Sequence, residues 1–172
     1  MSVPEKEQKL KELIATHKDM IYRLCYAYLY NKEDIEDLFQ EITINIWNHL
    51  DQFKGASKIS TWIYRIVVNS ALLYNKKDKK QRAVFSHADI EASNTPTDES
   101  EEYLEKEKKI AQLNAAINQL KKQDRLIISL VLEGVKYEEI AEIMGMTMSY
   151  VGVKINRIKT TLFNLLQENS NG

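Results

Sequence analysis

Turn-forming residues are scarce in this sequence, which contains five glycines and two prolines among 172 residues. A sandwich or barrel of short strands needs many tight turns, and glycine and proline form a large share of them. The composition, 44% hydrophobic and 28% charged, is typical of a globular protein with a buried core. We therefore predict an all-α fold, and the length allows either one domain or two small helical ones.

Apolar residues recur at helical spacing at the start of the chain. They predict a first helix from about Glu5 to about Tyr30 and a second helix whose apolar stripe runs over residues 35–50. Asn31 can end the first helix or cap the second. The acidic residues that follow Asn31 complement the dipole of a helix N-terminus, so we expect the second helix to begin there.

Two interruptions divide the rest of the chain. Residues 54–57 (KGAS) break the pattern, and Ser60 or Thr61 can cap a third helix. Residues 86–100 (SHADIEASNTPTDES) have no apolar periodicity, and their small polar and acidic side chains are typical of a flexible linker. We predict two small helical domains, 1–85 and 104–172, joined by a flexible acidic linker, 86–103.

The second half ends in a pattern typical of a helix-turn-helix. Helices are expected at 104–120 and 126–131, the latter closed by Gly134. Residues 137–144 predict a short helix, with Gly145 in the turn and Thr147 as the N-cap of a last helix that reaches about Leu166. The apolar face of that helix comprises Val151, Ile155, Ile158, Leu162 and Leu165. Its other face presents Ser149, Tyr150, Gly152, Val153, Lys154, Asn156, Arg157 and Lys159. Such a face suits the major groove of DNA, although an ordinary αα-hairpin remains an alternative.

Charge is strongly segregated along a chain whose net charge is −1. Residues 54–85 hold eight bases and one acid, and residues 86–107 hold one base and eight acids. A basic zone of this density suits a polyanion. We hypothesise that the acidic segment competes with DNA for the basic one in the free protein.

The basic zone also contains residue types that hold unstacked nucleic-acid bases. Trp62, Tyr64, Arg65 and Asn69 combine aromatic faces, a cation and an amide. The lysine-rich run that follows, 76–82, more simply neutralises phosphates.

These segments resemble a known family. The first half carries in order DLFQE (37–41), Trp47, FKG (53–55), STW (60–62) and YRIVVN (64–69), and this series is similar to domain two of bacterial sigma factors. LEG (132–134), YEEIA (137–141) and the turn after them resemble sigma domain four. With these two domains alone, the chain resembles the extracytoplasmic-function group.

The resemblance implies a transcription initiation factor that binds core RNA polymerase and directs promoter recognition and melting. It implies that the core polymerase is contacted by Asp37, Gln40 and Glu41. It assigns the minus-ten DNA contacts to Lys54, Lys58, Ser60, Arg65, Asn69, Lys76, Lys77 and Lys80, with the loop 54–59 receiving a flipped base. The minus-thirty-five contacts fall to Thr147, Ser149, Tyr150, Lys154, Asn156 and Arg157. Gly152 and Lys154 stand where lysine and arginine are common in the family, so a relative's promoter sequence does not transfer.

The sequence leaves other function classes open. A conventional helix-turn-helix regulator would bind duplex DNA without core polymerase, and an adaptor would use both helical domains for protein contacts only. An enzyme is disfavoured, because there is no Walker loop, no nucleophile motif and no zinc spacing among Cys25 and the three histidines. Cys25 is expected to be a small core residue.

We expect neither cofactor, metal nor small-molecule substrate. The sequence contains no apolar run long enough for a bilayer and no signal peptide, so a cytoplasmic protein, not an integral membrane one, is predicted. An anti-sigma factor is a further partner that the family resemblance implies.

Overall fold

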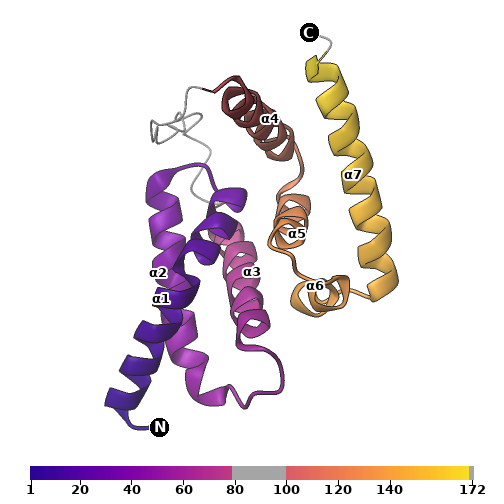
Figure 1. The fold of residues 1–172 in the computed structure, drawn as a ribbon. Helices are drawn as coiled ribbons and strands as arrows, with labels where there is room; N and C mark the ends of the chain where they lie inside the picture. The colour runs from indigo at the N-terminus through magenta and orange to yellow at the C-terminus, as the bar shows by residue number, and fades with distance from the viewer. Residues whose placement is uncertain (79–99, 171–172) are drawn as a thin grey trace.

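The computed structural model describes the backbone of residues 1–78 and 100–170 and the side chains of residues 1–74 and 100–169. All regular structure in these ranges is helical (Figure 1). In chain order the elements are α1 (Val3–Tyr28), α2 (Lys32–His49), the short 3-10 helix η1 (Leu50–Gln52), α3 (Ile59–Asp78), α4 (Glu101–Asn118), α5 (Lys122–Leu132), α6 (Tyr137–Met144) and α7 (Met148–Ser170). The prediction of an all-α fold is confirmed.

Hydrogen bonds between side chains and backbone fix where the first two helices begin. The hydroxyl of Ser2 accepts from the N–H of Glu5 at 3.4 Å, and the carboxylate of Glu5 accepts from the N–H of Ser2 at 2.7 Å. This reciprocal capping box starts α1 two residues before the predicted Glu5. Asn31 Oδ1 accepts from the N–H of Glu33 at 2.8 Å, which confirms Asn31 as the cap of α2.

Helices α1, α2 and α3 form the first bundle. Their fully buried side chains include Ile21, Leu24, Ile35, Leu38, Ile42, Ile46, Ile63, Val67 and Val68. Asn45 Nδ2 donates to Ser70 Oγ at 2.9 Å and ties α2 to α3. Helix α3 begins at Ile59, so the predicted capping role of Ser60 or Thr61 is wrong. Both residues lie inside the first turn, where Thr61 is buried.

The predicted turn and cap of the helix-turn-helix are confirmed. Gly145 has φ +65°, the left-handed conformation, and the N–H of Met146 donates to Ala141 O at 2.9 Å. Thr147 Oγ1 accepts from the N–H of Tyr150 at 3.2 Å at the start of α7. The predicted apolar face of α7 is buried at Val151, Ile155, Ile158 and Leu162 and half-buried at Leu165.

Helix α4 differs from its prediction. It begins at Glu101, capped by Ser100, so the last three residues of the predicted linker 86–103 are helical. Residues 86–99, on which most of the linker and competition hypotheses rest, lie outside the described residues. Leu104 and Ile110 are 55% and 50% exposed, because only the C-terminal part of α4 reaches the core, through Ala116, Ile117 and Leu120.

The two halves pack against each other rather than standing apart. Helix α5 lies against α1, and α6 lies against α3 (Figure 1). The buried apolar side chains form one continuous cluster across both halves. Two of the predicted DNA contacts, Lys58 and Arg65, lie at this contact with α6.

Candidate nucleic-acid interface

A hollow of about 580 Å³ opens between the end of α2, the loop that follows it and α3. Its volume is within the range of about 300–1,000 Å³ that is typical of ligand sites. The loop turns at Gly55, whose φ of +75° is strained for other residues. The predicted DNA contacts Lys54, Arg65 and Asn69 all line this hollow.

The walls of the hollow combine aromatic and polar groups. The rings of Phe53 and Trp62 are 5.2 Å apart at an interplanar angle of 45°, and both side chains are half-buried. Asn69 is exposed and offers an amide donor and acceptor, and Arg65 supplies a cation beside it. An unstacked base presents a π-face and a hydrogen-bonding edge, and these groups match both.

Two of the predicted DNA-binding cations are engaged by α6. Lys58 Nζ lies 3.0 Å from Glu139 Oε1, and Arg65 Nη2 pairs with the carboxylate of Glu142. The hydrogen bond from Lys58 lowers the pKa of Glu139, which therefore stays ionised near neutral pH. Because these side chains keep between 25% and 70% of their surface exposed, the pairs are screened by salt and stabilise the fold only slightly.

The remaining predicted DNA contacts of residues 54–85 are half-buried or have side chains that lie outside the described residues. Ser60 is half-buried in the first turn of α3. Lys76 and Lys77 lie in the last turns of α3, but their side chains are outside the described residues, as is the whole of Lys80.

The outer face of α7 is open to solvent at most of the predicted positions. The exposed residues are Thr147, Ser149, Tyr150, Asn156 and Arg157. Lys154 was expected on this exposed face, and that expectation is wrong. Its Nζ lies 2.7 Å from Asp124 Oδ1, with the two side chains 19% and 20% exposed, because α5 packs beside α7 at this point.

The outer face of α2 carries the residues predicted to contact polymerase. Asp37 and Gln40 are exposed and Glu41 is half-buried, whereas Leu38 between them is fully buried. Ile44, one turn further on, is 58% exposed on the same face of α2.

Comparisons with known proteins find matches in both halves of the chain. The family model "Sigma-70 region 2" matches residues 13–81, and "Sigma-70, region 4" matches residues 110–162. RNA polymerase sigma factor SigV of Bacillus subtilis (strain 168) is 31% identical over 172 residues, which are 95% of this chain and 92% of the relative. The ECF RNA polymerase sigma-E factor of Escherichia coli (strain K12) is 32% identical, over 90% of this chain and 85% of the relative. This chain belongs to the extracytoplasmic-function sigma factors.

Solved structures share the fold of this sigma factor. The structure of CnrH in complex with the cytosolic domain of CnrY has a TM-score of 0.64 at 20% identity and covers 94% of this chain and 90% of CnrH. The sigma factor RpoE in complex with the anti-sigma factor NepR from Bartonella quintana has a TM-score of 0.71 at 21% identity, covering 93% and 98%.

Membership of the family decides the function class. The sigma factor is a transcription initiation factor that acts with RNA polymerase, so the alternative of a regulator independent of polymerase is not favoured. Sigma factors are not a class of enzymes. Within residues 1–78 and 100–170, no group of His, Cys, Asp and Glu could hold a metal ion, and no helix could span a membrane.

Sequence reasoning missed several residues at these surfaces. Asn45, His49 and Gln52 line the hollow from the end of α2 and η1. The spacing of four between Asn45 and His49 places both on one side of a helix, and this signal could have found them. Ile44 lies outside the apolar stripe predicted for α2, which marks it as an exposed contact candidate.

Proposed function

We propose that this sigma factor binds core RNA polymerase through the outer face of α2 and holds one unstacked promoter base in the hollow beside α3. The observation that supports the proposal is the continuity of the two surfaces: the end of α2 forms one wall of the hollow. A polymerase bound to Asp37, Gln40 and Glu41 would therefore deliver promoter DNA to the hollow in a fixed register.

The proposed steps are binding steps, because the core enzyme performs the chemistry. Asn69 and Arg65 read the edge of the extruded base and Trp62 supplies a stacking surface, which lowers the free-energy cost of unpairing it. Lys54, with Lys76 and Lys77 near the end of α3 and Lys80 after it, neutralises the strand phosphates.

The second half sets the upstream register. The exposed side chains of α7 enter the major groove at the minus-thirty-five element, with Ser149, Tyr150, Asn156 and Arg157 facing base edges and phosphates. The proposed domain division assigns residues 1–85 to polymerase and the minus-ten element and, because α4 begins at Glu101, residues 101–172 to the minus-thirty-five element.

An anti-sigma factor is the proposed protein regulator. One solved neighbour of similar fold, RpoE of Bartonella quintana, is bound to the anti-sigma factor NepR. The interaction is proposed for this chain by analogy of fold.

Run-off transcription with purified core polymerase, on a promoter selected with this sigma factor, tests the function. We expect transcripts only when both components are present. Asp37→Arg combined with Glu41→Arg should abolish core binding, measured by fluorescence anisotropy, because both carboxylates lie on the proposed contact face. The double reversal Glu7→Arg/Glu12→Arg, at exposed positions of α1, makes the same charge change and is the control for charge alone. Core binding that survives the double reversal would contradict the assignment of α2.

Promoter melting tests the hollow separately. Asn69→Ala should leave core binding intact and reduce permanganate reactivity of the melted strand, because the base loses its hydrogen-bond partner. Asn114→Ala, at an exposed position of α4, is the matched control. Equal reactivity in the two variants would remove Asn69 from the mechanism.

A further inference from the structure

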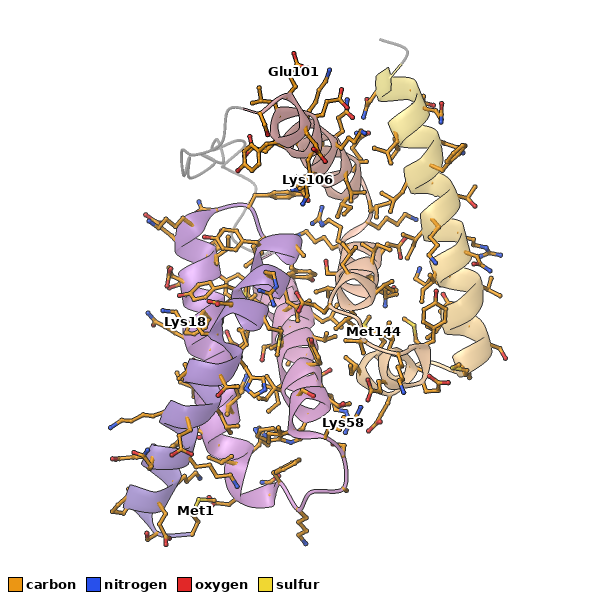
Figure 2. The ribbon with its side chains drawn as sticks, in the orientation of Figure 1. Met1, Lys18, Lys58, Glu101, Lys106 and Met144 are labelled. Carbon is orange, nitrogen blue, oxygen red and sulfur yellow. The ribbon has the colours of Figure 1, made fainter. Side chains whose placement is uncertain are left out.

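A histidine forms part of the α2 wall of the hollow. His49 is the last residue of α2, whereas Asn69 lies on α3, and both residues line the hollow. The end of α2 and the start of α3 lie at the same end of the first bundle, which Lys58, the residue before α3, marks in Figure 2. His49 is exposed, so its ring is accessible to a ligand in the hollow.

A hydrogen bond within α2 determines which ring nitrogen of His49 carries the hydrogen. Nδ1 lies 2.8 Å from Asn45 O, one turn earlier in the helix. A backbone carbonyl can only accept, so Nδ1 must donate. In the neutral ring the second nitrogen, Nε2, is then an acceptor with no hydrogen of its own. Within the described part of the chain, the side chain of His49 makes this hydrogen bond alone, which leaves Nε2 for a ligand.

The wall that carries His49 is tied to α3. Asn45 Nδ2 donates to Ser70 Oγ at 2.9 Å, and Ser70 is 2% exposed. Asn45 therefore contacts α3 through its side chain and His49 through its carbonyl oxygen. Ser70 directly follows Asn69 in the sequence. Two hydrogen bonds thus connect the imidazole on one wall to the helix turn that carries the Asn69 amide on the other.

A second set of contacts fixes the segment that follows His49. Lys6 of α1 pairs with Asp51 of η1, and the side chain of Lys6 is only 12% exposed. Lys6 Nζ also lies 4.7 Å from the centroid of the Trp47 ring of α2. His49 is therefore held between Trp47 and Asp51, both of which α1 contacts. A reading group needs such support, because small displacements weaken a directional hydrogen bond.

The acceptor at Nε2 differs from the other polar groups of the hollow. Lys54 and Arg65 carry hydrogens on their charged groups and can only donate. The amides of Gln52 and Asn69 can turn either an oxygen or an NH₂ group toward a ligand. The hydrogen bond at Nδ1 allows His49 no such choice, so it can discriminate between donors and acceptors on a base.

We propose that His49 is a specificity-determining residue, which accepts a hydrogen bond at Nε2 from the exocyclic amino group of the extruded base. The hollow then favours adenine or cytosine, whose hydrogen-bonding edges carry an amino group. Thymine and guanine present a carbonyl oxygen at the corresponding place, and this oxygen would face the lone pair of Nε2. The inference rests on the proposed function of the hollow and adds the class of base that it holds.

Binding of the holoenzyme, the sigma factor with core polymerase, to DNA with an unpaired minus-ten strand tests the role of His49. Each unpaired position in turn carries adenine, cytosine, or the analogue that lacks only the amino group, purine or 2-pyrimidinone. At one position the amino-bearing base should bind about fivefold more tightly than its analogue, as expected from the loss of one hydrogen bond. Measurements at about pH 8 keep an ordinary imidazole neutral.

Three variants separate the acceptor from other effects. His49→Phe keeps a ring and removes both nitrogens, so the ratio of the two affinities should fall to about one. His49→Gln places an amide oxygen near the position of Nε2 and should restore part of the preference. His17→Phe is the matched control, because His17 Nδ1 makes the same kind of hydrogen bond, to Leu13 O at 2.9 Å on α1, away from the hollow. Each ratio compares two DNAs with one holoenzyme, so changes in stability or core affinity cancel.

Two results would overturn the inference: an equal ratio in the unmodified protein and His49→Phe, or no position at which loss of the amino group weakens binding. The permanganate comparison of Asn69→Ala with Asn114→Ala tests the hollow independently. If these two variants melt promoter DNA alike, the proposed function of the hollow fails. If Asn69→Ala impairs melting and His49→Phe keeps the preference for the amino group, the assignment of His49 alone fails.

Discussion

Gly152 offers a sharp test of how the proposed reading helix is stabilised. It lies in the second turn of α7, and a Cβ built on it meets no other atom within 4 Å. Gly152→Ala therefore introduces no clash, and it removes the extra backbone freedom of glycine in the unfolded chain. The expected gain is about 0.8–1.0 kcal/mol in the free energy of unfolding. For a chain of this length, such a gain corresponds to a rise in Tm of roughly 2–4 °C.

Gly145 provides the matched comparison, since its Cβ position is equally empty but its φ is +65°. Gly145→Ala must place a side chain in the left-handed region, which costs about 1–2 kcal/mol. The two positions thus differ in backbone conformation and not in the space available for a Cβ atom. Urea unfolding followed by far-ultraviolet circular dichroism measures both.

A destabilised Gly152→Ala, or a Gly145→Ala as stable as the unmodified protein, would refute this reasoning. A third variant extends the test to function. Gly152→Lys should keep part of the helical gain and add one cation to the proposed DNA face of α7. The slope of log K against log salt for duplex DNA should then steepen by about 0.9.

Three further predictions concern other parts of the molecule. Asp124→Asn releases Lys154 from its ion pair, so we expect the free energy of unfolding, measured in urea, to fall by about 1 kcal/mol. The freed lysine should make the binding of non-specific duplex DNA tighter and more salt-dependent. A variant with unchanged DNA affinity would contradict a DNA-facing role for Lys154. Ile44→Ser should change stability by less than about 0.5 kcal/mol but weaken core polymerase binding, because the side chain is 58% exposed and available to a partner; equal anisotropy titrations would exclude Ile44 from the interface. Burial raises the pKa of the Cys25 thiol from 9.0 to about 12, so the folded protein holds this proton more tightly than the unfolded chain does. The contribution of this thiol to the free energy of unfolding is therefore present below pH 9 and lost between pH 9 and about 12. Native Cys25 should react with a disulfide reagent at pH 8 far more slowly than in urea, and equal rates would contradict its burial.

Local physical chemistry made much of this fold predictable. Helix periodicity over α1, α2 and α7 depends on residues three and four apart, and the bounds of α6 were predicted to the residue, Tyr137–Met144. Gly145 and Thr147 act within one turn of their own positions, so their roles as turn and cap could be assigned without knowledge of the rest of the chain.

The same holds for the composition of the candidate site. Arg65 and Asn69 were selected by residue type and Lys54 by the family resemblance, and the structure brings all three to one hollow. Local reasoning failed at the start of α3, where Ser60 and Thr61 are good caps by residue type. The helix starts before them, at Ile59, and Thr61 is buried instead.

Only the tertiary structure decided which charged groups meet. Lys154 pairs with a residue thirty positions away, Arg65 with one seventy-seven positions away, and Arg125 with the end of a helix in the other half of the chain. The sequence by itself determined an all-α chain with a turn at Gly145 and a cationic stretch after α2, because those properties arise within a few residues. The packing of whole helices decides the exposure of Leu104 and Ile44 and the contact of α6 with α3. Helix packing depends on contacts between distant residues, which no local pattern contains.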